Sequence, residues 1–389
     1  MNKIRLSFTG CGLGDFIYKN VDFSSEKFRH YCSLTPGDGG LSPGKLVFAD
    51  DFERFSGVSV YQFLQEVLPD STPDTFNIGG PALVSSICAA QLFADADVNY
   101  FGATGTDEKS FLIKELLARI PFLQTHFEQK EGGTPYTIVL SDPEYDKGKG
   151  ERMFINNIGA AAHFSNQHLT SDFWKSDLLV FGGTALVPQL HTDLTALLQE
   201  AKNRHCFTVV TTVFDFISEK QHPHKPWPLG DTAKSLPLID LLIMDFEEAK
   251  RISGGQTEAE MVGFFKTQGC KAFVFTRGSE PTYVCANSSR FEPVDRFFPI
   301  CPWVADDFRS NPALRGDTTG CGDNFAGAVI ASIAHQLQSG KKVLSLEEAV
   351  ALGTVAGAHA CYFVGGVFFE EVPGQRATLL NEWTERFQG

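Results

Sequence analysis

Short apolar runs that alternate with helical stretches restrict the fold of this sequence more than any other feature. The runs are rich in Val, Ile, Leu and Phe, which is the composition of strands buried on both faces of a parallel sheet. Strands and helices in this order are typical of βαβ units, whose helices cover both faces of the sheet. We therefore predict an α/β fold with a doubly wound, mostly parallel sheet. The predicted strands are Ile4–Thr9, Val98–Phe101, Leu178–Phe181, Phe207–Val213, Leu238–Met244 and Ala272–Thr276.

Two segments interrupt the alternation and predict a second, smaller sheet. Residues 16–50 contain a turn-rich run of Pro, Gly, Asp and Ser between apolar pieces. Residues 134–160 predict a hairpin whose arms are Pro135–Leu140 and Glu151–Asn157, joined by a turn over Asp142–Gly150. We expect the two segments to form a small β appendage beside the main sheet.

The remaining stretches predict helices. One helix is expected over Gly79–Phe93, and residues 51–75 predict a surface helix followed by a loop. Near the C-terminus, Ser345 opens a capping-box pattern, and a helix rich in Ala and Gly follows over Ala349–Gly366. Because no repeat or low-complexity tract divides the chain, we expect one α/β domain over residues 1–389 that carries the small appendage.

Charge and cysteine content exclude several classes of protein. The 33 basic and 47 acidic side chains give a net charge of −14. With no basic stripe to offset that charge, nucleic-acid binding is not expected. The nine cysteines contain no CxxC pair, which favours free thiols in a reducing compartment and argues against a zinc ribbon. We expect no signal peptide and no membrane partner, because no apolar run reaches the about 18–20 residues of a membrane span; a cytoplasmic location follows.

The strongest sign of chemistry is the run DTTGCGDNFAGAVI at residues 317–330. A polar, glycine-rich loop ends in Asp323, and the apolar spacing predicts that a helix begins there. Gly320 and Gly322 lack a Cβ, so their backbone can approach a ligand and present its amides. The positive end of the helix dipole adds to the attraction for an anion, and a transferring phosphoryl group fits this description. The alternative is a plain loop in which Asp323 caps the helix.

This run resembles the second signature of the ribokinase-like, PfkB-type carbohydrate and nucleoside kinases, which usually reads DTTGAGD before a helix. Cys321 stands where Ala is commonest. The resemblance implies that Asp323 is the catalytic base. It also implies that the amides from Gly320 through Cys321 and Gly322 to Asp323 form the anion hole for the γ-phosphate of ATP.

An earlier run, TGCGLGDF at residues 9–16, resembles the acceptor-binding strand of the same family. Its glycines approach the dinucleotide-binding fingerprint, but no helical pattern follows them. In the kinase family an Asp after the first strand binds substrate hydroxyls, a task that suits an acceptor-only carboxylate. The resemblance therefore assigns Asp15 to substrate binding, and a turn-forming Asp is the alternative.

The family's first signature is matched in part by the run NIGGP, which begins at Asn77. The resemblance assigns Asn77, Gly79 and Gly80 to substrate binding. The family usually has an Asn three or four residues beyond the glycine pair, where this chain has Leu83 and Val84. The departure leaves the identity of the acceptor open. The run GERMFINNIGAA (150–161) resembles the second lid strand, and its Arg152 is expected to be a solvated strand residue.

Two further runs resemble the family's metal and nucleotide segments. The run DFEE places Asp245 and Glu248 where the family has NxxE, and oxygen ligands of this kind suit a hydrated Mg²⁺. Glu248 in a solvated first turn of a helix is the alternative. The run TRGSEP resembles the nucleotide loop TxGxxG, with Pro in place of the last Gly. The residues assigned to the nucleotide are Thr276, Arg277, Gly278 and, from the second signature, Thr318.

The resemblance covers nearly the whole chain and implies transfer of the γ-phosphate of ATP to an alcohol, with a sugar hydroxyl expected first. A nucleoside kinase of the same fold is the first alternative, and a non-catalytic sugar- or nucleotide-binding relative is the second. Mg²⁺ is implied as cofactor, and activation by a monovalent cation is left open. The small β appendage would act as a lid that excludes water. Lids in this family often pair with a second subunit, so a homodimer through the lid is a further expectation.

Overall fold

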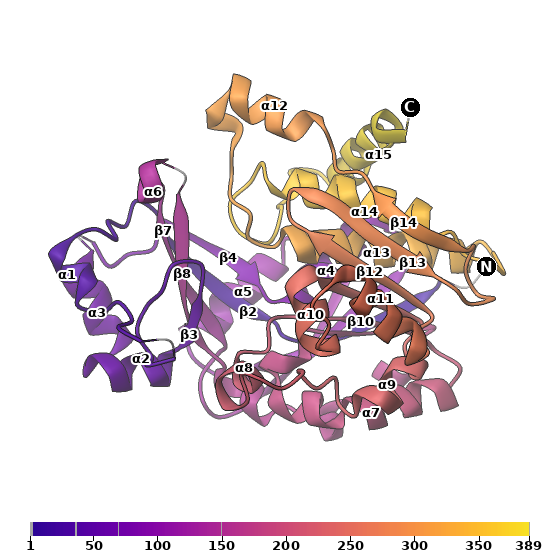
Figure 1. The fold of residues 1–389 in the computed structure, drawn as a ribbon, viewed down its shortest axis with the longest axis horizontal. Coiled ribbons are helices and arrows are strands. Elements are labelled where there is room, and N and C mark those ends of the chain that lie inside the picture. Colours follow the sequence, from indigo (N-terminus) through magenta and orange to yellow (C-terminus); the bar gives the residue numbers. More distant parts are fainter. Residues whose placement is uncertain (1–2, 36, 69, 149, 389) are drawn as a thin grey trace.

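A sheet of nine strands forms the centre of the larger part of the molecule in this computed structural model, which describes residues 3–35, 37–68, 70–148 and 150–388 (Figure 1). The sheet order is β14-β13-β12-β11-β10-β9-β1-β5-β6. Its strands are β1 (Arg5–Gly10), β5 (Asp97–Thr104), β6 (Leu123–Gln129), β9 (Leu178–Gly182), β10 (Phe207–Thr211), β11 (Leu241–Asp245), β12 (Ala272–Arg277), β13 (Glu280–Ala286) and β14 (Val294–Phe298).

The strands from β6 to β12 run parallel, and β13 and β14 complete the sheet in antiparallel pairing. The predicted doubly wound α/β fold is therefore confirmed. All the predicted strands are present, although the one expected from Leu238 begins only at Leu241, after a 3-10 turn. The strands β6, β13 and β14 were not predicted, because polar residues interrupt their apolar pattern.

Helices cover both faces of this sheet, and successive strand residues point to opposite faces. Leu178 and Val180 face one helical layer, while Leu179 and Phe181 face the other. The helices of the first layer are α4 (Pro81–Leu92), α5 (Glu108–Leu117), α13 (Cys321–Gln338) and α14 (Leu346–Ala360). Those of the second layer are α7 (Pro188–Asn203), α8 (Phe216–Gln221), α9 (Thr232–Ser235), α10 (Phe246–Ser253) and α11 (Glu258–Thr267).

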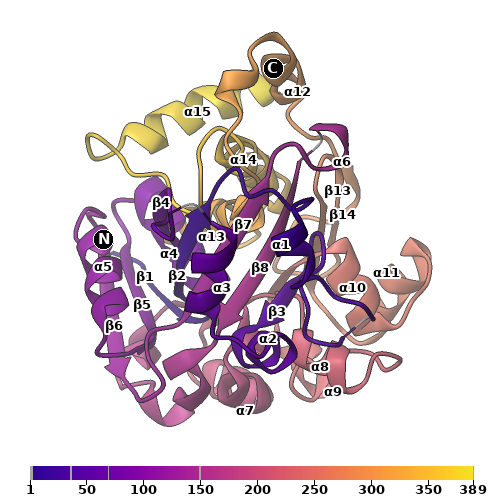
Figure 2. The same cartoon turned by 90° about the vertical axis from the view of Figure 1, so that its left-hand side faces the viewer.

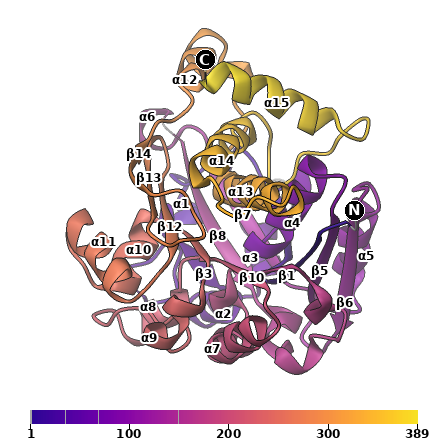
Figure 3. The same cartoon turned by 90° about the vertical axis from the view of Figure 1, so that its right-hand side faces the viewer.

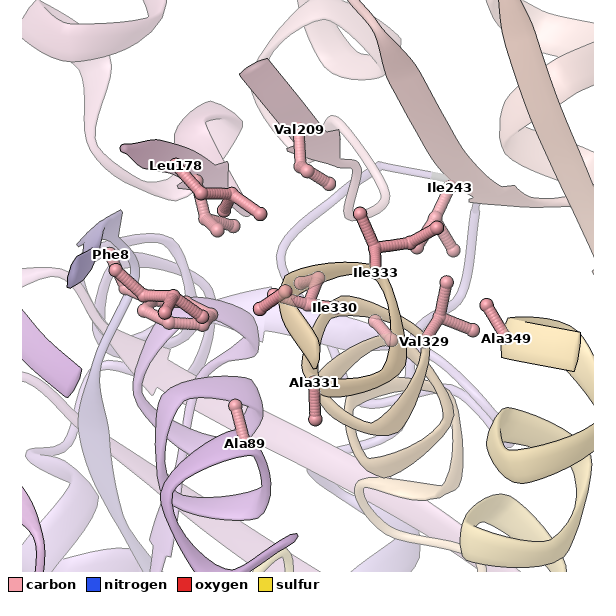
Figure 4. Packing of buried hydrophobic residues seen from close by; sticks show 14 of the residues in the cluster. Phe8, Ala89, Leu178, Val209, Ile243, Val329, Ile330, Ala331, Ile333 and Ala349 are labelled. Carbon is pink, nitrogen blue, oxygen red and sulfur yellow. The ribbon is translucent and has the colours of Figure 1, made fainter. Parts of the chain in front are cut away.

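The helix α13 lies in the middle of the first layer, between α4 and α14 (Figure 3). Its sequence is apolar on all sides, as expected for a helix buried all round. Ile330 and Ile333 point toward the strand residues Phe8, Leu178 and Val209 (Figure 4). Packing against the sheet therefore fixes the position of α13 and of the loop that precedes it.

Two predicted helix boundaries were wrong. The helix α13 begins at Cys321 and not at Asp323, because Gly320 takes the N-cap position. Asp323 therefore lies inside the first turn, and the alternative in which it caps the helix is excluded. The helix α14 ends at Ala360 and does not continue to Gly366; its N-cap is Ser345, whose side chain accepts from the amide of Glu348.

A second sheet, with strand order β3-β8-β7-β2-β4, lies beside the first. Its inner face looks toward the carboxyl ends of the parallel strands, and α1, α2 and α3 cover its outer face (Figure 2). Its strands are β2 (Leu13–Tyr18), β3 (Leu46–Phe48), β4 (Thr75–Gly79), β7 (Tyr136–Asp142) and β8 (Glu151–Asn157). The outer helices are α1 (Glu26–Arg29), α2 (Ala49–Ser56) and α3 (Val60–Val67).

The segment 51–75 differs from its prediction. It contains parts of two helices, and Phe52 and Phe63 on them are fully buried against the small sheet. The segment also ends in the edge strand β4, which lies outside the ranges expected for the small sheet. The small sheet therefore draws on more of the chain than two segments.

The remaining elements lie at the periphery. They are α6 (Tyr145–Gly148), α12 (Trp303–Ser310), α15 (Gln375–Gln388) and the 3-10 turns η1 (Gly159–His163), η2 (Asn166–His168), η3 (Phe173–Lys175), η4 (Thr184–Leu186), η5 (Leu236–Leu238) and η6 (Pro312–Leu314). The helix α15 packs on α14 (Figure 3). Within the described ranges, each helix is too short or too polar to cross a bilayer.

Candidate active site

The chain passes from the large sheet to the small one at the carboxyl end of β1. Gly10 ends β1 with φ 131°, and a Cβ there would lie 1.8 Å from the carbonyl oxygen of Gly182 on the neighbouring strand β9. Only glycine fits this approach. Three residues further on, β2 begins in the small sheet at Leu13, so Asp15 is carried over the ends of the parallel strands. Ligands of open α/β sheets bind at this edge.

The start of α13, residues 320–323, has the geometry expected of an anion-binding turn and is called by that name. Gly320 has φ 72°, and a Cβ on it would lie 2.7 Å from the Cα of Gly366. The amides of Gly322 and Asp323 belong to the first helical turn, whose N–H groups have no intrahelical acceptor. Open space lies in front of Gly322, since a Cβ there would meet no atom within 4 Å. The amides and the helix dipole together suit a phosphoryl group.

Asp323 lies on the same turn as these amides. Burial raises the pKa of its carboxyl to about 7. A carboxyl with a pKa near neutrality is matched to proton transfer, because it is ionised often enough to accept a proton and basic enough to hold one. The turn therefore combines an anion site with a group that can act as a general base.

Asp15 faces the same space from the small sheet. Burial raises the pKa of Asp15 to about 8, and the charges of Asp317 and Asp323 add to this effect, while Arg152 and a bond from Thr137 oppose it. The pKa of Asp15 is therefore sensitive to the charges at the start of α13. Room for its carboxylate comes from a neighbouring glycine: a Cβ on Gly79 would lie 2.3 Å from Oδ2 of Asp15.

The other residues of the NIGGP run have structural partners. Asn77 is buried and donates from Nδ2 to the carbonyl oxygens of Val364 (2.8 Å) and Val367 (3.3 Å). Its amide nitrogen therefore holds the loop after α14, and substrate binding by Asn77 stays a prediction. Gly80, with φ 90°, is the N-cap of α4. At the positions where the family usually has Asn, Leu83 and Val84 lie in the hydrophobic core.

Arg152 reaches the loop of the second signature, which the sequence did not predict. From β8 it donates to the hydroxyl oxygens of Thr319 (2.5 Å) and Thr318 (2.6 Å). The expectation of a solvated strand residue was therefore wrong. The predicted nucleotide residue Thr318 lies next to the anion-binding turn and is held by this contact. This contact depends on how the small sheet packs against the start of α13, and no local sequence pattern predicts that packing.

Arg277, at the end of β12, forms ion pairs and ring contacts with neighbouring elements. The guanidinium of Arg277 pairs with Glu280 (3.0 Å) and Glu258 (3.6 Å) and lies over the rings of Phe246 and Phe297. Arg277 is therefore engaged already, and its contact with a nucleotide stays a prediction. Thr276 ends β12, and Gly278 makes the following turn with φ 60°.

Asp245 and Glu248 form the capping box of α10. The amide of Glu248 donates to Asp245, and the amide of Asp245 donates to Glu248, which also accepts from the hydroxyl of Thr212. Burial raises the pKa of Glu248 to about 8, and the charges of Asp245 and, more weakly, Asp323 contribute. Glu248 is thus buried, and the alternative of a solvated position in the first turn is excluded for this residue.

Asp245 and Glu248 are the candidate protein ligands for Mg²⁺. Asp245 and Glu248 supply oxygen atoms, which this ion prefers. In the described part of the chain, no group of three or more acidic, His or Cys side chains could hold a metal. The residues therefore fit an ion that is bound mainly by water and nucleotide phosphates, and they do not fit a closed protein site.

A buried arginine stabilises the anion-binding turn through its contact with Asn324. Arg376, on α15, is fully buried and donates to the side-chain oxygens of Asn324 (2.6 Å) and Gln91 (2.8 Å). Because a guanidinium can only donate, it fixes which end of the Asn324 amide faces it. The Nδ2 of Asn324 then donates to the carbonyl oxygens of Gly320 and Gly366, both at 2.8 Å.

The fold and this site define a phosphotransferase with a hydroxyl group as acceptor. The chain belongs to the pfkB family of carbohydrate kinases, whose sequence model matches residues 58–368. Solved structures share the ribokinase-like fold. Adenosine kinase from Schistosoma mansoni with 2-fluoroadenosine aligns with a TM-score of 0.69 at 17% identity, over 95% of this chain and 98% of that one.

Two further structures illustrate the range of relatives. Ribokinase from Giardia lamblia aligns with a TM-score of 0.66 at 14% identity, over 98% of this chain and 100% of that one. Adenosine kinase from Sinorhizobium meliloti aligns with a TM-score of 0.69 at 17% identity, over 98% of this chain and 100% of that one. No curated protein sequence gives a match. The predicted family is confirmed, and the neighbours include enzymes of both sugars and nucleosides.

Proposed function

We propose that this protein transfers the γ-phosphate of ATP to a hydroxyl of a sugar or a nucleoside, with Asp323 as the catalytic base. The observation that carries the proposal is the first turn of α13, which joins an anion-binding set of amides to a carboxyl whose pKa burial raises to about 7. Gly320, Cys321 and Gly322 supply the backbone of the anion hole. Positioning and electrostatic stabilisation of this kind are what phosphoryl transfer requires.

Each residue has a task in the proposed reaction. Asp15 accepts hydrogen bonds from hydroxyls of the acceptor and so orients it. Asp323 takes the proton of the attacking hydroxyl as the new O–P bond forms. The amides of Gly322 and Asp323 neutralise charge on the transferred group. The small sheet covers the site and excludes water, which limits ATP hydrolysis.

The nucleotide would lie beside the start of α13, near Thr318 and the Thr276–Gly278 turn. Asp245 and Glu248 would hold Mg²⁺ through water and phosphate oxygens. This ion would supply positive charge against the phosphates. A nearby cation would lower the pKa of Glu248, which burial raises to about 8, because the cation favours the charged form of the carboxyl.

A row of side chains on the inner face of the small sheet supports a nucleoside as the second candidate acceptor. Strand register aligns Phe48, Asn156, Thr137, Asp15 and Asn77 across the five strands. Adjacent strands lie about 4.8 Å apart, so about 10 Å separates Asp15 from Asn156. An acceptor that contacts both is longer than a free pentose.

The far end of this row has features of a site for a flat ring. Asn156 is buried and donates to Thr137 (3.0 Å), while its Oδ1 has no partner among the described residues. Beside it, Phe48 and Phe216 approach to 6.2 Å between ring centroids. A free acceptor oxygen next to aromatic rings suits a nucleobase that carries an N–H donor.

An acceptor screen tests the proposal. Release of ADP from Mg·ATP is measured with ribose, fructose, glucose, adenosine and inosine, and the phosphorylated product is identified by ³¹P NMR. The proposal predicts ADP release that depends on one of these hydroxyl compounds. Turnover of a nucleoside with none of free ribose would favour the second candidate. ADP release that is the same with and without every acceptor would contradict the proposal.

A further inference from the structure

All nine cysteines are free thiols, and their environments differ. Six are buried, whereas Cys32, Cys321 and Cys361 are half-buried. Two of these three lie together: Sγ of Cys321 is 3.5 Å from Sγ of Cys361. The pair therefore combines thiol contact with access for a small reagent.

Neighbouring elements hold the pair together across 40 residues of sequence. Cys321 is the first residue of α13, and Cys361 follows the last residue of α14. The two helices pack so closely that a Cβ on Gly357 would lie 3.2 Å from the carbonyl oxygen of Cys321. The amide of Gly316 donates to the carbonyl oxygen of Cys361 at 2.8 Å, which ties the phosphate loop to the same place.

The two thiols are chemically unequal. The contact with the Cys321 thiol lowers the pKa of Cys361, as does Arg315 more weakly, while burial and the charge of Asp317 oppose this effect. The same contact raises the pKa of Cys321. The thiolate is the reactive form of cysteine, so Cys361 is the better nucleophile and Cys321 the better resolving thiol.

We propose that Cys361 and Cys321 form a modification site for hydroperoxides, whose oxidation to a disulfide deforms the anion hole. The Cys361 thiolate attacks the outer oxygen of the peroxide, and the O–O bond breaks to give a sulfenic acid and an alcohol, or water from H₂O₂. The Cys321 sulfur then attacks the Cys361 sulfur, and the S–O bond breaks; the hydroxide leaves with the Cys321 proton as water. Two thiols are oxidised and one peroxide is reduced.

The effect on function rests on the proposed phosphotransfer. Bond formation must bring the two sulfur atoms closer than their contact distance. The backbone of Cys321 lies directly before the amides of Gly322 and Asp323, so its displacement moves the phosphate-binding groups. Alanine, which is commonest at this position in the family, has no such reaction. The replacement of that alanine by Cys321 therefore matters chemically, because a second thiol lies at contact distance.

The experiment uses the full chain, H₂O₂ as probe and mass spectrometry as the first readout. After H₂O₂ treatment we expect peptides that contain Cys321 and Cys361 to be linked, and the link to disappear with dithiothreitol. Cys361→Ser removes the link. Cys32→Ser is the matched control, because Cys32 is equally half-buried but is paired with no other thiol, and this variant should keep the link. Absence of the link in the wild type would overturn the proposed site.

Turnover is the second readout. Wild-type turnover should fall about 10²-fold on oxidation, the loss seen when an anion-hole donor is removed, and dithiothreitol should restore it. Cys361→Ser should keep its turnover under the same treatment. A linked protein with unchanged turnover would overturn the effect on the anion hole. If the reduced protein transfers no phosphate, the proposed function fails, and the mass spectrum still decides whether the thiol site exists.

Discussion

Burial makes the carboxyls of Asp323 and Asp15 harder to ionise than free side chains. The pKa of Asp323 is raised to about 7, and that of Asp15 to about 8, where the charge of Asp323 contributes. A buried carboxylate lowers the stability of the folded protein, and groups of this kind are typical of functional sites.

The raised pKa of Asp323 predicts the pH dependence of activity. A general base must be ionised, so turnover should fall as the pH drops through about 8 to about 7, where the acceptor-binding Asp15 and then Asp323 take up protons. The acid limb of kcat/KM against pH, measured with saturating ATP, gives the value for the enzyme without acceptor. An acid limb near pH 4, the range of an unperturbed carboxyl, would contradict the assignment.

The same shift predicts an effect on stability. A folded-state pKa raised above the unfolded value means that the folded protein binds the proton more tightly, so this contribution is complete below about pH 4 and is lost as the pH rises through about 7. Asp323→Asn removes the cost of burying the charge. We expect it to raise the unfolding midpoint relative to wild type more at pH 8 than at pH 5, measured by thermal unfolding. An equal difference at both values would contradict the raised pKa.

At the scale of elements, α15 supports α13 through one polar contact chain. Asn324→Asp keeps an oxygen for Arg376 but removes the amide donor to Gly320 and Gly366. The new carboxylate pairs with Arg376 but repels the two carbonyl oxygens, so we expect a modest loss of stability and a kcat that falls about 10²-fold, the cost of a misplaced catalytic group. Asn324→Leu should also lower the free energy of unfolding by about 3 kcal/mol, because it leaves a buried cation short of an acceptor. Urea unfolding and kcat separate the two effects; full turnover of Asn324→Asp would contradict the positioning role.

The contact of β8 with the second-signature loop predicts the role of the small sheet. Arg152→Met removes both bonds to Thr318 and Thr319, and hydrogen bonds of a charged group contribute about 1.5–3 kcal/mol each. We expect phosphotransfer to fall about tenfold or more and ATP hydrolysis without acceptor to rise, because the sheet closes less firmly. Arg29→Met, on the exposed surface of α1, is the control. Unchanged coupling of ATP use to product would argue against the closing role.

Helices and strands could be predicted from the sequence wherever burial imposes a regular pattern of apolar residues. The parallel strands could be predicted because strands buried on both faces are apolar runs. The loop before α13 could be predicted because it is a glycine-rich turn that precedes a helix. Arg152 and Asn324 were missed because their partners, Thr318 and Arg376, lie 166 and 52 residues away. Only the closure of the small sheet and the docking of α15 bring these pairs together.

Over the whole molecule, α13 connects the chemistry to the core. The outer face of the small sheet is covered by its own helices and cannot contact a second subunit (Figure 2). The predicted homodimer would have to use the inner face or the edge strands β3 and β4.

Ile330→Ala tests the connection between core and site. Ile330 is fully buried between α13 and the strands, and its truncation should lower the free energy of unfolding by about 2–5 kcal/mol. Because the side chain is far along the helix from the phosphate turn, the KM for ATP should remain near the wild-type value. Val343→Ala, at a position 46% exposed, is the control. A large change in KM with little loss of stability would contradict this division of roles.

The decisive measurement is the rate of phosphate transfer by Asp323→Asn beside wild type, with ATP binding measured on the same samples. Asp306→Asn, an exposed carboxyl on α12, serves as control. The amides of the anion-binding turn are unchanged by the substitution, so we expect ATP affinity to persist while turnover falls by at least about 10²-fold, the contribution of a general base. Turnover above about a tenth of the wild-type rate would show that another group takes the proton.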